Sequence, residues 1–167
     1  MKKILSLTMA LAMLGTALTG CGSKDAAAQT PTENTQQTAP VQQEQSQTEK
    51  ALALINTFAT GDTDAARSLL ADGYIQHNLA YGTGANAFIG SVEYLASADV
   101  KTTVNNIRAF EDGDKVFLQT IYNFAGAGEQ VAFDIFRFDE DGKIAEHWDV
   151  METIADQSTW QNQNGKF

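Results

Sequence analysis

Three ionisable residues lie inside two short apolar stretches near the end of the chain. Asp134 stands among aromatic and aliphatic residues, and His147 and Asp149 enclose Trp148. A carboxylate in an apolar strand is costly unless it has a partner or a function. Such a carboxyl group is suited to general acid/base chemistry, and a nearby histidine is suited to exchange the proton with it. These residue types predict a pocket where a proton moves to or from a bound molecule.

A hairpin is expected to bring these residues together. Two strand-like stretches, 130–138 and 143–153, flank an Asp-Gly dipeptide at 141–142 that is typical of tight turns. Side chains alternate between the faces of a strand, so the two ionisable residues of the second stretch share a face. If Asp134 lies on that side of the sheet, cross-strand contact follows, and Asp149 then orients the imidazole of His147 or stabilises its charged form.

Structural roles explain the same residues equally well at this stage. Asp134 has two arginines as candidate ion-pair partners, Arg108 and Arg137. His147 and Asp149 would fit a hydrogen-bonded pair in a polar network of the core. The sequence leaves the catalytic and the structural interpretation open for all three residues.

Metal and cofactor sites are not predicted. The two histidines and their neighbouring carboxylates match no standard spacing of metal ligands. The loop at 82–84 reads Gly-Thr-Gly but lacks the lysine and the context of a phosphate-binding loop. The chain has no Gly-x-Ser-x-Gly nucleophile motif. We therefore expect chemistry that needs no cofactor.

Helices are expected before strands, which is the order of an α+β fold. Apolar spacing predicts three helices in the first half of the domain, at 51–58, 63–70 and 87–98. A short extended piece, 74–78, lies between the second and the third. Alternating residues and Asp-Gly or Gly-rich turns then predict four antiparallel strands, at 102–111, 115–124, 130–138 and 143–153.

The N-terminal segment is typical of an exported lipoprotein. Lys2 and Lys3 precede an apolar run, and the run ends in Leu-Thr-Gly-Cys at 18–21, which resembles a bacterial lipobox. We expect residues 1–20 to be a signal peptide and Cys21 to carry lipid that anchors the protein to the cell membrane or the outer membrane. The alternative is an ordinary secreted protein with a free thiol at Cys21.

The segment after the lipobox, residues 21–49, is predicted to be a disordered tether. It is rich in Gln, Thr, Ala, Ser and Pro and has no aromatic residue, so it cannot bury enough apolar surface to offset its ordering entropy. The whole chain has a formal net charge of −10. This charge argues against nucleic-acid binding and against docking of a basic patch to the membrane, so lipid alone is expected to attach the protein.

Four short motifs resemble the SnoaL-like branch of the nuclear-transport-factor-two-like superfamily. They read YIQHN at 74–78, DIFR at 134–137, DGKI at 141–144 and EHWD at 146–149. The resemblance covers most of residues 50–155, which we take as one domain, with 156–167 as a loose C-terminal tail. It implies a cone-shaped, curved antiparallel sheet wrapped against N-terminal helices and enclosing a pocket.

The resemblance also implies roles for particular residues. An aspartate on the corresponding strand acts as the acid/base in the polyketide cyclases of this family, and Asp134 matches it. His77 is expected near the mouth of the pocket with Tyr74 and Asn78, where they would bond a substrate oxygen. Tyr122 is expected to contact the ligand as well. A structural role, capping a backbone turn, remains the alternative for His77.

The predicted function follows from the pocket and the anchor. We expect an anchored, exported domain that binds a small apolar organic molecule and catalyses cofactor-independent proton transfer, such as aldol-type cyclisation, isomerisation or dehydration. Non-catalytic members of the family give the alternative, a ligand-binding or homodimerisation module of the cell envelope. Fold resemblance alone does not separate an enzyme from a binding module.

Overall fold

The computed structural model describes residues 44–167. The predicted signal peptide, Cys21 and most of the predicted tether therefore lie outside the described residues. Three helices begin the described part: α1 (Gln47–Thr60), α2 (Thr63–Leu69) and α3 (Ala85–Ser97). No helix within residues 44–167 has the length and hydropathy needed to cross a membrane.

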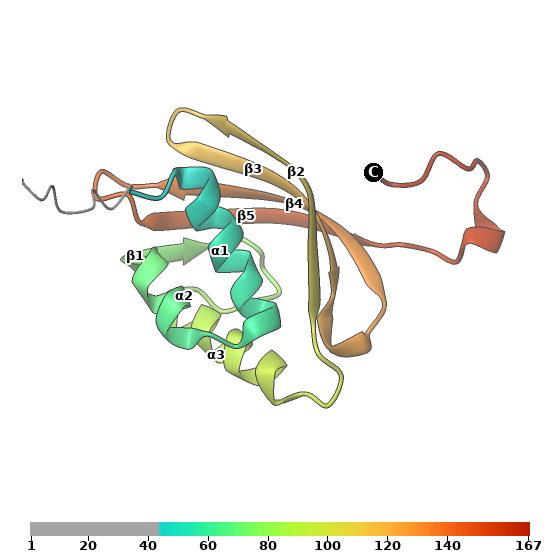
Figure 1. The fold of residues 1–167 in the computed structure, drawn as a ribbon, viewed down its shortest axis with the longest axis horizontal. Helices are drawn as coiled ribbons and strands as arrows, with labels where there is room; N and C mark the ends of the chain where they lie inside the picture. The colour runs from blue at the N-terminus through green and yellow to red at the C-terminus, as the bar shows by residue number, and fades with distance from the viewer. Residues whose placement is uncertain (1–43) are drawn as a thin grey trace, which may run out of the picture. The chain divides into compact units, whose positions relative to one another are not determined.

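Five strands form one strongly bent sheet, and the helices pack against one of its faces (Figure 1). The strands are β1 (Leu70–Gln76), β2 (Thr103–Asp112), β3 (Lys115–Asn123), β4 (Glu129–Phe138) and β5 (Ile144–Thr153). Their order across the sheet is β1-β5-β4-β3-β2. The predicted α+β fold class, with a curved sheet against N-terminal helices, is confirmed.

The start of α1 is fixed by a capping box. The hydroxyl of Ser46 accepts from the backbone N–H of Glu49, and the Glu49 carboxylate accepts from the backbone N–H of Ser46. The helix thus begins inside the segment interpreted as a tether. It ends at Gly61, where φ is +74° and an added Cβ would lie 2.8 Å from the Cβ of Ala96 in α3. Only glycine fits this left-handed position and this close approach of two helices.

The second helix and the first strand differ from the prediction. Helix α2 ends at Leu69, and the chain enters β1 at Leu70 without a loop. Strand β1 pairs in parallel with β5, and its register shifts between Leu70 and Ile75. The sheet is therefore mixed, whereas the sequence predicted antiparallel strands alone. A parallel neighbour needs a long crossover, and here α3 and three strands separate the two partners in sequence.

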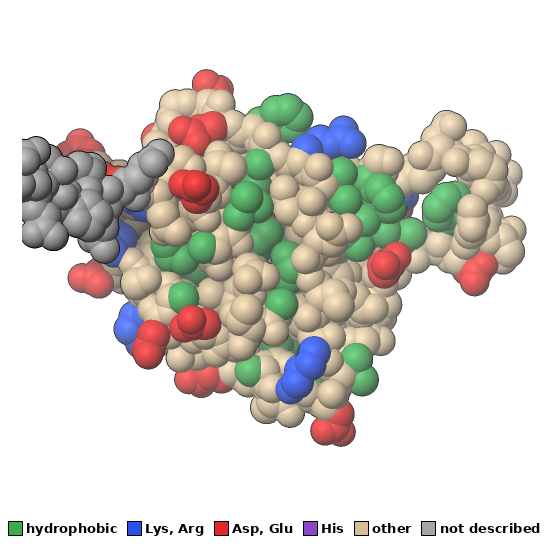
Figure 2. Space-filling model, in the orientation of Figure 1, with side chains coloured by type: hydrophobic (Ala, Val, Ile, Leu, Met, Phe, Trp, Pro, Cys, Tyr) green, Lys and Arg blue, Asp and Glu red, His purple; other side chains and the backbone are tan. Residues whose placement is uncertain are grey.

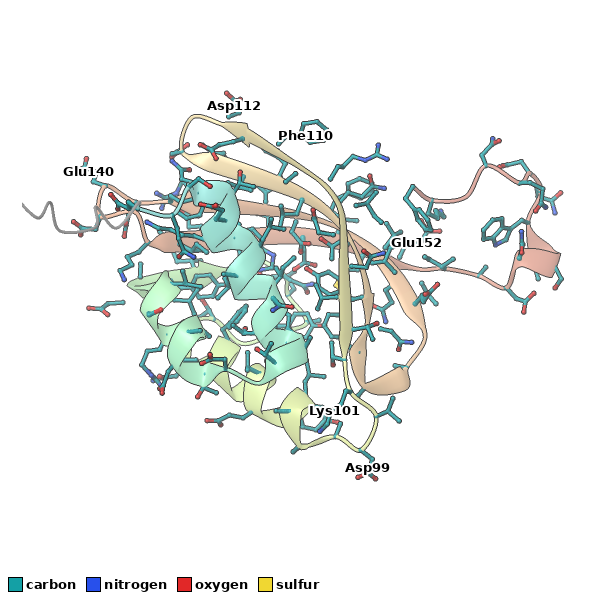
Figure 3. All side chains as sticks on the ribbon, viewed as in Figure 1. Asp99, Lys101, Phe110, Asp112, Glu140 and Glu152 are labelled. Carbon is teal, nitrogen blue, oxygen red and sulfur yellow. The ribbon has the colours of Figure 1, made fainter. Side chains whose placement is uncertain are left out.

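The two faces of the sheet have different environments. The inner face, which we define as the face toward the helices, carries fully buried core residues such as Val116, Leu118 and Phe136. The outer face carries exposed apolar side chains on four neighbouring strand positions, Phe110, Phe117, Phe133 and Val150. Phe110 projects away from the helices (Figure 3). Acidic side chains are spread over the visible face between apolar ones (Figure 2).

The C-terminal segment leaves β5 and turns back toward the sheet (Figure 1). It contains a short 3-10 helix, Gln157–Thr159. The backbone carbonyl of Lys166 accepts from the Gln119 side chain at 2.7 Å, and the Lys166 ammonium contacts Glu152 at 2.7 Å. These contacts attach the last residues to the outer face of the sheet.

Candidate active site

The register of β4 and β5 places the predicted acid/base residues side by side. Asp134 lies directly opposite Asp149, and Phe136 lies directly opposite His147. Because every second residue points to the same face, Asp134, His147 and Asp149 all project from the inner face. Phe136 is fully buried, and its ring stacks on the imidazole of His147 with centroids 4.3 Å apart. The hairpin thus fixes all three ionisable groups in one place.

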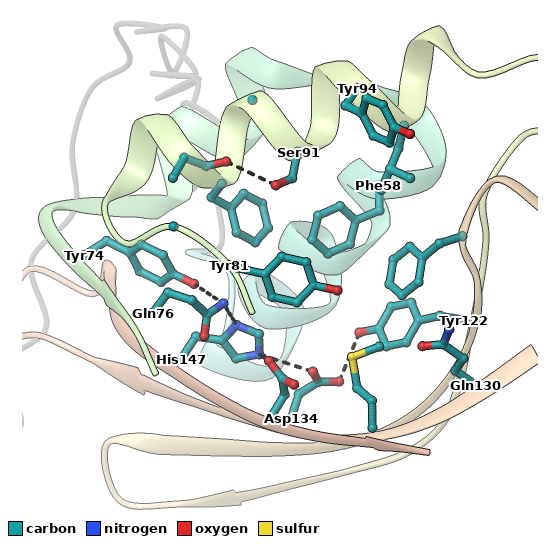
Figure 4. Close-up of a pocket in the computed structure, with 18 residues that line it drawn as sticks. Phe58, Tyr74, Gln76, Tyr81, Ser91, Tyr94, Tyr122, Gln130, Asp134 and His147 are labelled. Atoms are coloured by element: carbon teal, nitrogen blue, oxygen red, sulfur yellow. Dashed lines mark hydrogen bonds and ion pairs between the residues drawn. The ribbon is translucent and has the colours of Figure 1, made fainter. Parts of the chain in front are cut away.

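These groups form the polar end of a cavity of about 470 Å³ between the sheet and the helices (Figure 4). Seven of the other lining residues are aromatic. The aromatic rings that line it come from α1, β1, the loop before α3, α3 itself and the end of β3: Phe58, Tyr74, Tyr81, Phe88, Tyr94, Tyr122 and Phe124. A concave, mainly apolar cavity with a few convergent polar groups is the usual form of a small-molecule site.

Asp134 is a buried carboxylate with two hydrogen-bond donors. The hydroxyl of Tyr122 donates to its Oδ2 at 3.0 Å, and its Oδ1 lies 3.2 Å from Nε2 of His147. The side chain is 4% exposed. Arg137, one of the arginines considered as its ion-pair partner, instead binds Glu146. Among the described residues, neither arginine forms an ion pair with Asp134, so that alternative is contradicted.

Gln76 determines which nitrogen of His147 carries the proton. Its Oε1 accepts from the backbone N–H of Asn78 at 2.9 Å, so its amide nitrogen is the atom 2.9 Å from Nδ1 of His147. An amide nitrogen is a donor, and Nδ1 must therefore be the acceptor. The imidazole proton consequently lies on Nε2 and points to Asp134. In a neutral ring, Gln76 therefore favours the tautomer that carries its proton on Nε2.

The same contact argues against a metal at this position. Asp134, His147 and Asp149 offer ligand atoms that lie within 4.8 Å of one another. A histidine that binds a metal through Nε2 normally donates its Nδ1–H to an acceptor. Here Nδ1 faces the donor group of Gln76, which favours the opposite tautomer. The residues around the cluster therefore fit a proton-transfer site better than a metal site.

Asp149 has a buried side chain with one oxygen open to the cavity. Asn78 donates to Oδ1 at 2.6 Å. Oδ2 lies 3.9 Å from Nε2 of His147, and within residues 44–167 no donor lies within hydrogen-bond distance of it. Burial raises the pKa of Asp149, and the charge of Asp134 adds to this, against the opposing effects of His147 and Asn78.

Two tyrosines place hydroxyl groups beside this cluster. Burial and the nearby charges of Asp149 and Asp134 raise the pKa of Tyr74, and burial with Asp134 raises that of Tyr122. Both hydroxyls therefore remain protonated and act as donors. The Tyr122 hydroxyl donates to Asp134. The Tyr74 hydroxyl accepts from Gln76 at 3.4 Å, so its own proton is available to a ligand. Both tyrosines line the cavity, as predicted.

His77 and Asn78 are not where the sequence placed them. His77 lies on the outer face, where its ring stacks on Trp148 with centroids 4.4 Å apart and its Nε2 lies 2.9 Å from Glu146. Its neighbours in β1, Ile75 and Gln76, pair with Glu146 and His147, so strand alternation turns His77 away from the cavity. Asn78 does not line the cavity either, but its side chain donates a hydrogen bond to Asp149. The structure therefore places His77 outside the candidate site.

A profile of the SnoaL-like domain matches residues 51–147, more than half of the chain. The chain belongs to the SnoaL-like family. The matched region contains α1 to β4 and the first residues of β5 as far as His147. A sequence comparison with curated proteins gives no match.

Solved structures share the fold of this SnoaL-like domain at low sequence identity. An NTF2-like protein of unknown function from Cytophaga hutchinsonii matches with a TM-score of 0.57 and 17% identity over 67% of this chain and 95% of that chain. An LEH-like epoxide hydrolase from Mycobacterium tuberculosis gives 0.56 and 17%, over 64% and 82%. IdmH, a candidate polyketide cyclase from Streptomyces antibioticus, gives 0.52 and 18%, over 65% and 93%. At these identities the likeness establishes the fold alone.

Sequence reasoning missed several residues of the SnoaL-like cavity. Gln76 is the most important of them. It lies two positions after Tyr74, so strand alternation predicts that both side chains point to the inner face. Phe58 and Phe88 were recognised as apolar positions of helices, but no sequence signal distinguishes a cavity wall from ordinary core. Phe124 follows β3 directly and stacks on Tyr122 with centroids 4.9 Å apart.

Proposed function

We propose that this SnoaL-like domain binds a small, mostly apolar organic molecule in the cavity and exchanges a proton with it without a cofactor. One observation carries the proposal: three ionisable side chains, each at most 7% exposed, converge at one end of a mainly apolar cavity. Isomerisation, dehydration and aldol-type cyclisation all need such an exchange at a carbon or an oxygen.

Asp149 is the group best placed to meet the ligand. Both oxygens of Asp134 already accept hydrogen bonds, whereas Oδ2 of Asp149 is open to the cavity. In the proposed step the Asp149 carboxylate takes a proton from a carbon beside a carbonyl group, and the C–H electron pair moves onto the carbonyl oxygen. The hydroxyl of Tyr74 donates to that oxygen, and protonated Asp149 then returns the proton to carbon or to a departing hydroxyl group.

Hydrogen–deuterium exchange at carbon tests this proposal directly. The purified protein is incubated in D₂O with a panel of aryl and alkyl ketones, and deuterium uptake beside the carbonyl is followed by NMR. We expect exchange above background with the wild type and a loss of about 100-fold or more in Asp149→Asn. Asp99→Asn, which removes an exposed carboxylate, is the matched control. Exchange that survives in Asp149→Asn would refute the assigned step.

A second function, homodimerisation, is favoured by a separate observation. Phe110, Phe117, Phe133 and Val150 expose apolar surface on neighbouring strands of the outer face. Contiguous exposed apolar surface often marks an interaction site. Sedimentation velocity over a range of concentrations tests it. A dimer that Phe133→Ser dissociates supports this function, and a monomeric wild type at high concentration rejects it.

Attachment to a membrane through lipid on Cys21 is part of the same proposal and rests on the sequence. The lipobox-like motif at 18–21 supports it. Expression in a bacterium with radiolabelled palmitate tests it, because a lipoprotein takes up label and fractionates with membranes. Cys21→Ser should abolish the label and release the protein. A wild-type protein without label would be a secreted protein with a free thiol.

A further inference from the structure

We propose that the ligand of this cavity is a hydrophobic organic cation, such as a protonated amine attached to an aromatic or polycyclic body. This inference rests on the ligand-binding half of the proposed function and names the charge of the molecule that the cavity accepts. It is carried by three features of the site: two buried carboxylates without a lysine or arginine partner, a single imidazole between them, and seven aromatic rings among the lining residues.

In the described part of the chain, no lysine or arginine compensates the charge of the two carboxylates. Asp134 and Asp149 are directly opposite on adjacent strands, and each side chain is 4% exposed. Like charges at directly opposed positions destabilise a sheet, and buried charges are normally paired. Within residues 44–167, no lysine or arginine lies within 4.0 Å of either carboxylate or lines the cavity.

His147 does not balance both carboxylates. Among the described residues it is the one basic side chain beside them, and a positive imidazole would carry a single charge against two. The amide nitrogen of Gln76, 2.9 Å from Nδ1, is itself a donor and opposes a second proton on the ring. Gln76 cannot turn over without losing the bond from the backbone N–H of Asn78 to its oxygen. Two carboxylates therefore face one imidazole, which leaves negative charge for a ligand.

The open oxygen of Asp149 marks where the cation would bind. The Asp149 side chain is 4% exposed and lines the cavity, and Oδ2 has no donor among the described residues. The raised pKa of Asp149 has burial and the charge of Asp134 as its causes, and a bound cation would reverse both effects. Tyr122 donates to Asp134 at this end of the cavity, and its ring forms one cluster with the rings of Phe58 and Phe124. Phe58 and Tyr122 both line the cavity (Figure 4). Their faces attract a cation as well as apolar groups.

The entrance of the cavity agrees with this assignment. Tyr81 and Tyr94 line the cavity and are 50% and 74% exposed, so an arriving ligand meets aromatic rings first. The chain as a whole is strongly acidic, with a net charge of −10. A negative surface raises the local concentration of cations and repels anions. A carboxylate or phosphate ligand would meet no basic side chain among the lining residues.

Three probes of nearly equal shape test the inference. 1-Naphthylmethylamine is a cation at neutral pH, 1-naphthalenemethanol is neutral, and 1-naphthoate is an anion. Binding to the purified full chain is measured by calorimetry. NMR locates it, because a ligand in the cavity shifts the ring signals of His147 and leaves those of His77 on the outer face unchanged. We expect the amine to bind at least tenfold more tightly than the alcohol and the anion not to bind.

Asp149→Asn should reduce the preference for the amine to about twofold or less. Asp99→Asn removes the same charge from an exposed loop and should leave the preference intact, which separates the local from the overall charge effect. If the alcohol binds in the cavity as tightly as the amine, the inference is wrong but the proposed function stands. If none of the probes shifts His147, ligand binding in this cavity fails, and the inference fails with it.

Discussion

The two faces of the β4–β5 hairpin reverse the usual distribution of polar and apolar residues. The inner face buries Asp134, His147 and Asp149, whereas the outer face exposes Phe133 and Val150. Polar groups are normally exposed, and apolar groups gather inside. Burying ionisable groups and exposing apolar groups both cost stability. We therefore interpret each face as a binding surface. We propose that the inner face presents charge to a small molecule and that the outer face presents apolar surface to a larger partner.

The two faces also differ in the partners that their carboxylates have. On the outer face, Glu146 accepts from Arg137 at 2.6 Å and lies 2.9 Å from His77, so acid and base are matched. On the inner face, two carboxylates share a single imidazole. The outer cluster is complete without a ligand. The inner cluster is incomplete, and the following experiments test this difference from the largest expected effect to the smallest.

Removing an aromatic ring should lower the free energy of unfolding much more on the inner face than on the outer face. Phe136 is fully buried beneath His147, so Phe136→Ala should lower the free energy of unfolding by about 3–5 kcal/mol. Phe133, one strand position from Asp134, is 55% exposed, and Phe133→Ala should cost less than about 1 kcal/mol in a monomer. Urea unfolding measures both. Equal losses would show that the outer face is covered.

Removing one hydroxyl should show how far Asp134 depends on its donors. Tyr122→Phe leaves Oδ2 of Asp134 buried without its donor and should lower the free energy of unfolding by about 1–3 kcal/mol. Tyr94→Phe removes a hydroxyl from an exposed tyrosine and serves as the matched control, with no measurable change expected. Chemical denaturation near pH 7 checks the pair. An unchanged Tyr122→Phe variant would mean that Asp134 has another donor or is protonated.

The two faces should respond to pH in opposite directions. The pKa of Asp149 is raised above its ordinary 3.8, so its ionisation costs stability as the pH rises through the folded-state value. Asp149→Asn should therefore become more stable than the wild type as the pH rises from about 4 to neutrality, with no gain at lower pH. Unfolding curves from pH 3 to 8 measure this. A gain that persists below the ordinary pKa would be a packing effect.

Glu146 should give the reverse result. Its hydrogen bond with His77 and then that with Arg137 hold the pKa of Glu146 below its ordinary 4.5. Its contribution is complete above that value and is lost as the pH falls through the folded-state pKa. Glu146→Gln should thus lose a little stability at neutral pH and match the wild type in acid. A loss that does not depend on pH would contradict an electrostatic origin.

The smallest expected effect concerns the proton on His147. Gln76→Leu removes one hydrogen bond and should cost about 1 kcal/mol of stability. Nitrogen-15 NMR of the ring should show Nδ1 unprotonated and Nε2 protonated in the wild type, and a mixture of both neutral tautomers in the variant. His77 provides an internal reference in the same spectrum. A wild-type ring already mixed between tautomers would show that Gln76 does not fix the tautomer of His147.

Much of this arrangement follows from local sequence rules. The alternation along β4 and β5 and the turn between them put Asp134 on the same face as His147 before any coordinates are known. The same rule applied to β1 separates His77 from Tyr74, but the family resemblance grouped the two residues together. The Ser46–Glu49 capping box was also readable, since Ser-x-x-Glu is a helix-start signal.

Other features depend on contacts that no local pattern contains. The parallel pairing of β1 with β5 joins segments far apart in sequence, and the register shift in β1 comes from that pairing. The orientation of the Gln76 amide depends on the backbone of Asn78 and on a ring in another strand. Tertiary contacts of this kind decide the protonation of His147. For that reason the residue types predicted acid/base chemistry but not which group does it.

The parallel strand pair also governs when the cavity can exist during folding. Gln76 and His147 are 71 positions apart, and the strand that carries Tyr74 has only β5 as its neighbour in the sheet. Contacts over such separations form slowly, because a long loop must close first. During synthesis, β1 leaves the ribosome well before β5, so it cannot pair in the sheet until the last strand has been made. We therefore expect Tyr74 and Gln76 to reach their places in the cavity last. A chain truncated before β5 would lack His147 and Asp149, and it would also leave Tyr74 and Gln76 without their partner strand.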